Sequence, residues 1–99
     1  MFIVLYKWRV NPDSAGQFVE NWSAITRYYL ENCGSLGSRL HRGSDGLLYA
    51  YAQWPDTATR DKAMLDVTLE LARLHMKDAV LETFPEVMLE TVDDCLKLN

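Results

Sequence analysis

The strongest constraint in this sequence comes from two β-prone segments that are apolar on both faces. Residues 2–10 (FIVLYKWRV) and residues 47–54 (LLYAYAQW) are rich in β-branched and aromatic residues, which favour strands. Side chains alternate between the two faces of a strand, so a sheet with one face in water should alternate apolar and polar residues. Neither segment alternates in this way. Both faces of the predicted sheet therefore need an apolar cover.

A long amphipathic helix is predicted directly after the first strand. Asn11 and Pro12 end the strand and open the helix, because Asn accepts hydrogen bonds from free backbone N–H groups and Pro suits the first helical position. Apolar residues then recur at spacings of three and four up to about Cys33, and Gly34 ends the helix in a left-handed conformation. We expect this apolar stripe to lie in the core. It consists of Ala15, Phe18, Trp22, Ile25 and Tyr29.

Two neighbouring strands are predicted in the middle of the chain. Residues 35–42 are weakly apolar, with Arg39 and His41 on one face, which is typical of an edge strand. Residues 43–46 (GSDG) are all turn formers and should close a hairpin into the strand at residues 47–54. The two strands are therefore expected to pair antiparallel.

A second helical region and a final strand are predicted in the last part of the chain. Residues 58–84 form one long or broken helical stretch that Pro85 stops, with a break favoured near the β-branched pair Val67 and Thr68. Residues 87–93 (VMLETVD) follow as a strand. The helical stripe consists of Leu65, Leu69, Ala72, Met76 and Ala79.

The predicted fold is a single α+β domain over residues 1–99. The order of strand, helix, strand, strand, helix, strand is the split βαβ, or ferredoxin-like, arrangement. Right-handed crossovers place both helices on one face of a four-stranded antiparallel sheet. The small residues Ala50 and Ala52 let the helices sit close, so Tyr49 and Tyr51 are expected on the other face unless the register shifts by one residue.

The uncovered face of this sheet predicts a homodimer. Roughly six to eight large side chains would otherwise remain in water, and each would forgo roughly 1.5–3 kcal/mol of burial. The chain has no spare segment to cover them. We therefore expect two copies to pair face to face, so that their sheets enclose a barrel-like core.

Composition limits the other partners. The chain has 14 acidic and 10 basic residues and a net charge of -4, the wrong sign for a nucleic-acid backbone. Its longest wholly apolar run, residues 2–6, is far below the roughly 20 residues of a membrane span, and no secretory leader is recognisable. We expect no nucleic acid, no membrane insertion and a cytoplasmic location. Cys33 and Cys95 are expected to be free thiols outside any metal-ligand spacing.

The order and length of these elements resemble the antibiotic biosynthesis monooxygenase (ABM) family of dimeric α+β barrel proteins. The resemblance spans essentially the whole chain, through FIVLYKWRVNP, LLYAYAQWPD, TRDKAM, LARLHMKDAV and VMLETVDD. Its most specific part is the strand that ends at Trp54, followed by an acidic helix start. The resemblance implies a ferredoxin-like protomer, an obligate dimer, and cofactor-independent oxygenation of polycyclic phenols or quinol-like compounds.

A separate branch of similar fold degrades haem with an Asn on the first strand, a Trp in the second helical region and a His further along it. His75 resembles the last of these residues. Where the Asn would lie, the chain has Trp8 or its neighbours, and residues 62–66 contain no Trp. With two of the three residues missing, haem degradation is not expected.

The sequence gives no support for cofactor-bound chemistry, because no phosphate-binding loop, dinucleotide fingerprint or nucleophile elbow occurs, and the oxygenation that the resemblance implies needs no cofactor. This oxygenation needs a pocket that takes a proton from an electron-rich phenol, so that the anion can pass an electron to O2, and dipoles that hold the resulting anions. His75 is the candidate base, because imidazole titrates near neutral pH, and Arg60 is the candidate partner of an anionic oxygen. The candidate walls are Tyr6, Trp8, Tyr49, Tyr51 and Trp54.

Each of these residues also has a structural interpretation. In that case His75 faces solvent, the aromatic residues fill the core or the dimer seam, and Arg60 pairs with Asp56 or Asp61. The chain would then be a non-catalytic dimer that binds a small hydrophobic ligand or acts as an interaction module. The two interpretations differ in whether His75 and at least two of the aromatic residues share a cavity of roughly a few hundred cubic ångströms.

Overall fold

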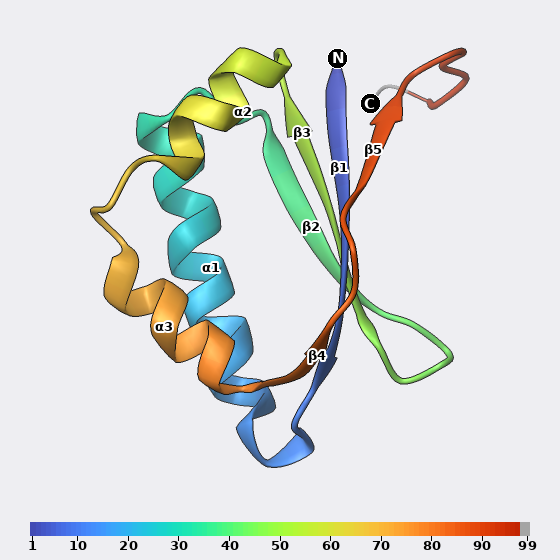
Figure 1. Cartoon of the computed structure of the whole chain (residues 1–99). Coiled ribbons are helices and arrows are strands. Elements are labelled where there is room, and N and C mark those ends of the chain that lie inside the picture. The colour runs from blue at the N-terminus through green and yellow to red at the C-terminus, as the bar shows by residue number, and fades with distance from the viewer. Residues whose placement is uncertain (98–99) are drawn as a thin grey trace.

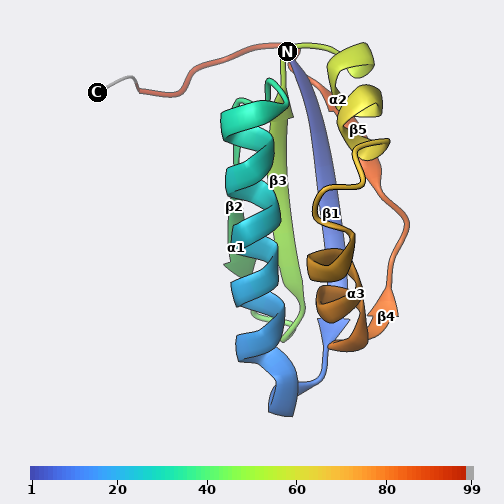
Figure 2. The same ribbon diagram turned by 90° about the vertical axis from the view of Figure 1, so that its left-hand side faces the viewer.

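The computed structural model describes residues 1–97 as one sheet with helices on a single side (Figure 1). In chain order the elements are β1 (Phe2–Val10), the 3₁₀ turn η1 (Pro12–Ser14), α1 (Ala15–Asn32), β2 (Gly37–Arg42), β3 (Leu48–Trp54), α2 (Thr57–Met64), α3 (Glu70–Asp78), β4 (Val80–Thr83) and β5 (Val87–Glu90). Figure 2 shows the three helices in front of the sheet, with α1 beside α3. The predicted α+β, ferredoxin-like class is confirmed.

The sheet is antiparallel throughout, with β1 at its centre. β1 pairs with β3 along residues 2–8. On its other side β1 pairs with β4 at residues 8–10 and with β5 at residues 2–5. Within residues 1–97, β2 pairs only with β3 and is an edge strand, as predicted.

The helical stretch predicted to run to Pro85 ends earlier, with α3, and the segment after it forms β4. Val10 lies opposite Val80 in this pairing. The Asn11 N–H donates to the Ala79 carbonyl at 2.9 Å. Main-chain groups at the end of β1 need such partners, and a β-branched residue at the start of β4 favours a strand. The sheet therefore has five strands rather than the predicted four, because β4 and β5 share one edge of β1.

The break predicted near Val67 is confirmed, because residues 65–69 separate α2 from α3. The helical spacing does not continue through this break. Leu65 of the predicted stripe is consequently 80% exposed. The final strand also ends at Glu90 rather than at residue 93.

The first half of the chain follows the prediction closely. The Asn11 side chain accepts a hydrogen bond from the Asp13 N–H at 3.0 Å, and Pro12 opens the turn that leads into α1. Gly34 has a φ of +76° just after the helix, a conformation that glycine adopts without strain. The buried members of the predicted stripe are Phe18 and Ile25.

The two faces of the sheet differ as predicted. Ala50 is buried in one cluster with Phe18 of α1, and Ala52 is buried in a second cluster on the same face. Tyr49 and Tyr51 alternate with these alanines and lie on the opposite, open face. All the helices cover the alanine side, so the open face has no second layer within residues 1–97 (Figure 1).

Two expectations concern the chain as a whole. Cys33 and Cys95 are both free thiols, as predicted. Within residues 1–97, no helix combines the length and the apolar character needed to cross a membrane.

Candidate functional site

A cavity of about 210 Å³ lies between the sheet and the helix layer, and we call it the inner cavity. Its walls are mainly apolar and aromatic, as is usual in small-molecule sites, and they include all three tryptophans of the chain. The lining residues are Tyr6, Trp8, Trp22, Ile25, Thr26, Tyr29, Ser35, Ser38, Ala52, Trp54, Met64, Arg73 and Met76.

The aromatic walls are held by ring contacts. The alternation of β1 brings Tyr6 and Trp8 to its helix-facing side, where the two rings are nearly parallel with centroids 5.5 Å apart. Trp8 also meets Phe18 of α1 edge to face at 5.1 Å. At the end of β3, Trp54 packs against Tyr29 of α1 with centroids 5.7 Å apart. Such contacts stabilise the walls beyond the burial of apolar area.

The first polar feature of the inner cavity is Tyr6, which Arg60 of α2 binds. Arg60 Nη2 donates to the Tyr6 hydroxyl oxygen at 3.1 Å and to Glu86 Oε2 at 2.7 Å. Burial raises the pKa of Tyr6, although the hydrogen bond and charge of Arg60 act to lower it. Burial also lowers the pKa of Arg60, but Tyr6 and Glu86 raise it by more. At neutral pH the cavity therefore holds a neutral phenol beside a cation.

The second polar feature is Tyr29, which Arg73 of α3 binds. Arg73 Nη2 donates to the Tyr29 hydroxyl oxygen at 2.6 Å, and Nη1 donates to the main-chain carbonyl of Asp66 at 2.5 Å. The guanidinium carbon also lies 5.7 Å from the centroid of the Tyr29 ring. Both tyrosines of the inner cavity thus accept a hydrogen bond from an arginine.

Two wall residues carry buried polar atoms with no hydrogen-bond partner in the described part of the chain. These atoms are the indole Nε1 of Trp54 and the hydroxyl oxygen of Ser38. A buried donor left unpaired costs about 1–3 kcal/mol. Because each of these atoms has almost no accessible surface, this cost falls on the folded chain itself.

Part of the predicted site comes together in the structure. Tyr6, Trp8 and Trp54 line the inner cavity, and Arg60 reaches it through the Tyr6 hydroxyl. Arg60 Nη1 lies 4.0 Å from the largely exposed carboxylate of the neighbouring Asp61, a longer contact than the 2.7 Å between Arg60 Nη2 and Glu86. Its close partner comes from the β4–β5 connection, which sequence spacing could not indicate.

The remaining predicted site residues lie elsewhere. Tyr49 and Tyr51 are on the open face, and the Tyr49 hydroxyl donates to Asp45 of the hairpin. His75 is exposed on α3. Among the residues that the structure describes, the lining includes the next residue, Met76, but not His75. The cavity therefore groups three of the predicted aromatic residues without the predicted base.

Sequence reasoning missed several lining residues. Trp22 and Tyr29 were expected in the core stripe of α1, but they are half-buried and form cavity wall. Arg73 lies three residues before Met76, so the two share a face of α3. This spacing was the sequence signal that could have placed Arg73 beside the cavity. Ser38, on an edge strand, carried no signal of its own.

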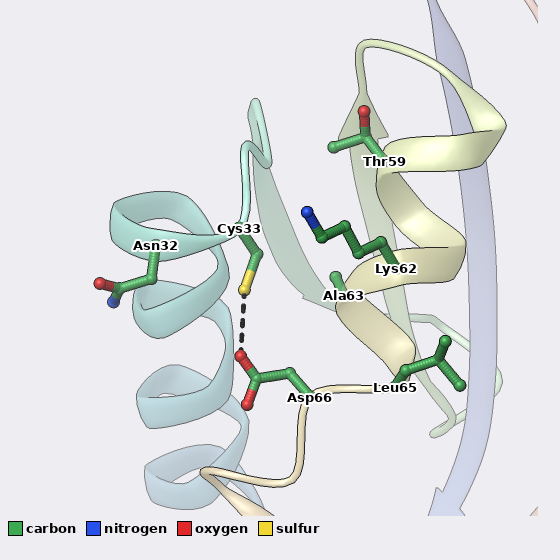
Figure 3. A pocket seen from close by; sticks show the side chains of 7 residues that line it. All are labelled: Asn32, Cys33, Thr59, Lys62, Ala63, Leu65 and Asp66. Carbon is green, nitrogen blue, oxygen red and sulfur yellow. Dashed lines mark hydrogen bonds between the residues drawn. The ribbon is translucent and has the colours of Figure 1, made fainter.

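A larger hollow of about 550 Å³, which we call the outer pocket, lies between the C-terminal end of α1 and α2 (Figure 3). It is lined by Asn32, Cys33, Thr59, Lys62, Ala63, Leu65 and Asp66. The figure shows the Cys33 thiol and the Asp66 carboxylate pointing toward each other. Their Sγ and Oδ2 atoms are 3.7 Å apart.

The Asp66 carboxylate and the Cys33 thiol of the outer pocket already have hydrogen-bond partners. Asp66 also accepts hydrogen bonds from the Tyr28 hydroxyl at 2.7 Å and the Thr68 N–H at 2.8 Å. Hydrogen bonds from Thr68 and Tyr28 lower the pKa of Asp66 to about 2. Burial and the Asp66 charge raise the pKa of Cys33, so it remains a thiol at neutral pH. Neither group is suited to act as a base or a nucleophile there.

No protein-family model matches the chain, and no curated protein matches it in sequence. Solved structures do match it. SnoaB from Streptomyces nogalater, described as a cofactor-independent oxygenase, has a TM-score of 0.82 at 12% identity over 97% of each chain. Rv0793 from Mycobacterium tuberculosis has a TM-score of 0.79 at 14% identity over 96% of this chain and 98% of its own. An antibiotic biosynthesis monooxygenase has a TM-score of 0.79 at 14% identity, over 94% and 100%.

The chain therefore has the fold of the ABM proteins, which confirms the fold that the sequence resemblance implied. At these identities the likeness establishes the fold, and the chemistry has to be argued from the site. Within residues 1–97, no group of three or more His, Cys, Asp or Glu side chains is placed to hold a metal ion.

Proposed function

We propose that this chain is a cofactor-independent monooxygenase that oxidises a small aromatic or quinol-like compound with O2 in the inner cavity. The observation that carries the proposal is an aromatic cavity whose two tyrosines are each bound by an arginine. SnoaB, described as a cofactor-independent oxygenase, has the same fold and supports this choice.

The proposed reaction converts a phenol into a quinone. The substrate loses its phenol proton, and the anion passes one electron to O2, which gives a substrate radical and superoxide. These combine to form a C–O bond at a ring carbon that bears hydrogen. The resulting peroxide loses water, so one oxygen atom stays as a carbonyl and the other leaves as H2O. The substrate supplies all the electrons.

Tyr6 and Arg60 have the properties needed to hold an anionic substrate oxygen. Because burial raises the pKa of Tyr6, its hydroxyl remains a donor rather than a base. The positive charge of Arg60 lies directly behind that hydroxyl, at 3.1 Å. A donor placed in this way stabilises negative charge where it develops.

The proton acceptor is a separate assignment. His75 stays the predicted base: it is exposed on α3, beside the cavity-lining Met76. The prediction is that His75→Ala slows turnover while leaving the binding of the phenol unchanged. Equal turnover in His75→Ala and the wild type would remove His75 from the mechanism.

The volume of the cavity restricts the substrate. Sites for drug-sized ligands have volumes of about 300–1,000 Å³. The inner cavity, at about 210 Å³, is smaller. We therefore propose a substrate of one or two rings, such as a naphthol.

Oxygen uptake with a panel of naphthols, quinols and anthrones tests the proposal. We expect a naphthol to consume one O2 per molecule and to form a quinone without releasing hydrogen peroxide. Tyr6→Phe should lower the rate by about tenfold or more, since it removes a donor to the developing anion. Tyr28→Phe is the matched control, because the Tyr28 phenol hydrogen-bonds to Asp66 and does not line the cavity. No uptake with any compound, or equal rates in the two variants, would contradict the proposal.

A second candidate is a non-catalytic binding protein. The lining residues found within positions 1–97 include no His, Cys, Asp or Glu, which favours binding over proton transfer. This candidate predicts that naphthols quench the fluorescence of the wall tryptophans while no oxygen is consumed. The same titration thus separates binding from catalysis.

We also propose that two copies pair through the open face of the sheet, as the sequence predicted. Leu5 and Tyr51 lie opposite each other on this face, and Val87 of β5 lies on the other side of Leu5. Val87 is 49% exposed. Light scattering should give about twice the 11.4 kDa of one chain, and Leu5→Glu should halve the mass. A monomer at micromolar concentration would contradict the pairing.

A further inference from the structure

The geometry points to Tyr29, held by Arg73, as a second specificity-determining residue of the inner cavity. With Tyr6 it makes the cavity selective for a small aromatic ligand that carries two acceptor oxygens. The inference rests on the proposed function, because it assumes that an aromatic ligand enters this cavity. It adds residues that the sequence analysis placed in the core or did not consider.

The two hydroxyls are prepared as donors in the same way. Each phenol oxygen accepts a hydrogen bond from an arginine Nη2 atom, at 3.1 Å for Tyr6 and 2.6 Å for Tyr29. Arginine has no acceptor, so the hydrogen of each phenol remains available. Within residues 1–97, neither phenol donates to a protein acceptor. A cation bound to the oxygen also makes an O–H group a stronger donor.

The two donors come from different layers of the fold. Tyr6 lies on β1, in the sheet, and Tyr29 lies on α1, in the helix layer. Their side chains line the same cavity. A ligand between the layers therefore meets one hydroxyl from each side.

Each donor is fixed independently of the other. Arg60 is anchored by Glu86 of the β4–β5 connection at 2.7 Å. Arg73 is anchored by the Asp66 carbonyl of the α2–α3 loop at 2.5 Å. Donors positioned by separate supports keep their direction without the ligand, which is the condition for selectivity.

A ligand with one oxygen can satisfy only one of these donors. The ligand would then bury the second phenol hydroxyl without giving it an acceptor. A buried donor left unpaired weakens binding, so the cavity discriminates against ligands with a single oxygen. We expect a dihydroxynaphthalene to bind about three- to tenfold more tightly than 1-naphthol, the range of one hydrogen bond.

Calorimetric titration under nitrogen tests this inference without turnover. The probes are 1-naphthol and the dihydroxynaphthalenes substituted at positions 1,4 and 1,5. In the wild type, at least one diol should show the three- to tenfold preference, and Tyr29→Phe should remove most of it. Tyr28→Phe is the matched control, because the neighbouring phenol hydrogen-bonds to Asp66 instead and is not part of the lining.

The outcomes separate this inference from the proposed function. If Tyr29→Phe weakens 1-naphthol and the diols equally, Tyr29 only shapes the wall, and the inference is overturned while the binding cavity stands. If the wild type binds none of the probes, both fail. Arg73→Gln is the second variant, and it should reduce the preference for a diol even if Tyr29→Phe proves unstable. An unchanged preference in Arg73→Gln would also overturn the inference.

Discussion

The inner cavity and the outer pocket differ in what their polar groups already do. The outer pocket has more than twice the volume, but the Asp66 carboxylate there accepts hydrogen bonds from Cys33, Tyr28 and Thr68. The inner cavity is smaller, yet its two phenols keep their hydrogens. Volume alone would have favoured the outer pocket, whereas the free phenol hydrogens within apolar, aromatic walls favour the inner cavity as the site.

The largest difference is expected in the loss of protein stability when a wall residue of either hollow is truncated. Trp54 is 2% exposed, so Trp54→Ala should lower the free energy of unfolding by about 3–5 kcal/mol. Leu65, in the wall of the outer pocket, is 80% exposed, and Leu65→Ala should change it by less than about 0.5 kcal/mol. Urea unfolding measures both values. Similar losses in the two variants would erase the contrast.

A smaller effect is expected at alkaline pH, on the contribution of Tyr6 to the free energy of unfolding. Tyr6→Phe should cost about 1–3 kcal/mol at neutral pH, because it removes a buried hydrogen bond to a charged group. Burial raises the pKa of Tyr6 above its usual 10.0, so the folded state favours the neutral phenol. This stabilisation is present below about pH 10 and is lost as the pH rises through the folded pKa. The gap in unfolding free energy between wild type and Tyr6→Phe should therefore narrow above about pH 10.

The outer pocket should respond at the opposite end of the pH scale. The pKa of Asp66 is lowered to about 2 from 3.8, so its contribution to stability is present above the unfolded pKa and is lost as the pH falls toward about 2. Thermal unfolding of wild type and Asp66→Asn should therefore differ at neutral pH and converge in acid. Because Asp66 is only half-buried, we expect a smaller effect than for Tyr6. A constant difference down to pH 2 would contradict the Asp66 hydrogen-bond network.

The smallest effect concerns thiol reactivity. Burial and Asp66 raise the pKa of Cys33, whereas Cys95 is exposed. Since the thiolate is the reacting form, Cys95 should be alkylated several-fold faster than Cys33 at neutral pH. Asp66→Asn should narrow the difference, because it removes a negative charge beside Cys33. Peptide mass spectrometry after a timed iodoacetamide pulse measures the two rates.

Local signals predicted much of the fold. Asn11 and Pro12 open the turn η1 that leads into α1, Gly34 follows the end of α1, and the turn residues at positions 43–46 set the β2–β3 hairpin. The last part of the chain was harder to predict, because the helical stretch expected over residues 58–84 includes Val80–Thr83, which forms β4. Only the unpaired main chain at the end of β1 decided that this segment is a strand.

Local sequence patterns also predicted part of the candidate site. Alternation along β1 and β3 was sufficient to group Tyr6, Trp8 and Trp54 and to place Tyr51 on the opposite face once the register was known. The sequence indicated Arg60 as a site residue but gave no sign of its ion-pair partner Glu86. The two residues are distant in sequence and meet only in the folded chain.

By itself, the sequence determined the order of the elements up to α3, the turn residues that flank α1 and the apolar character of both strand faces, because these depend on neighbouring residues and on periodicity. The tertiary structure alone decided which polar groups meet. Arg60 and Arg73 reach Tyr6 and Tyr29 across separations of 54 and 44 positions, and no local pattern encodes such contacts. Hydrogen bonds act over about 3 Å, so their partners are known only when the packed layers bring them together.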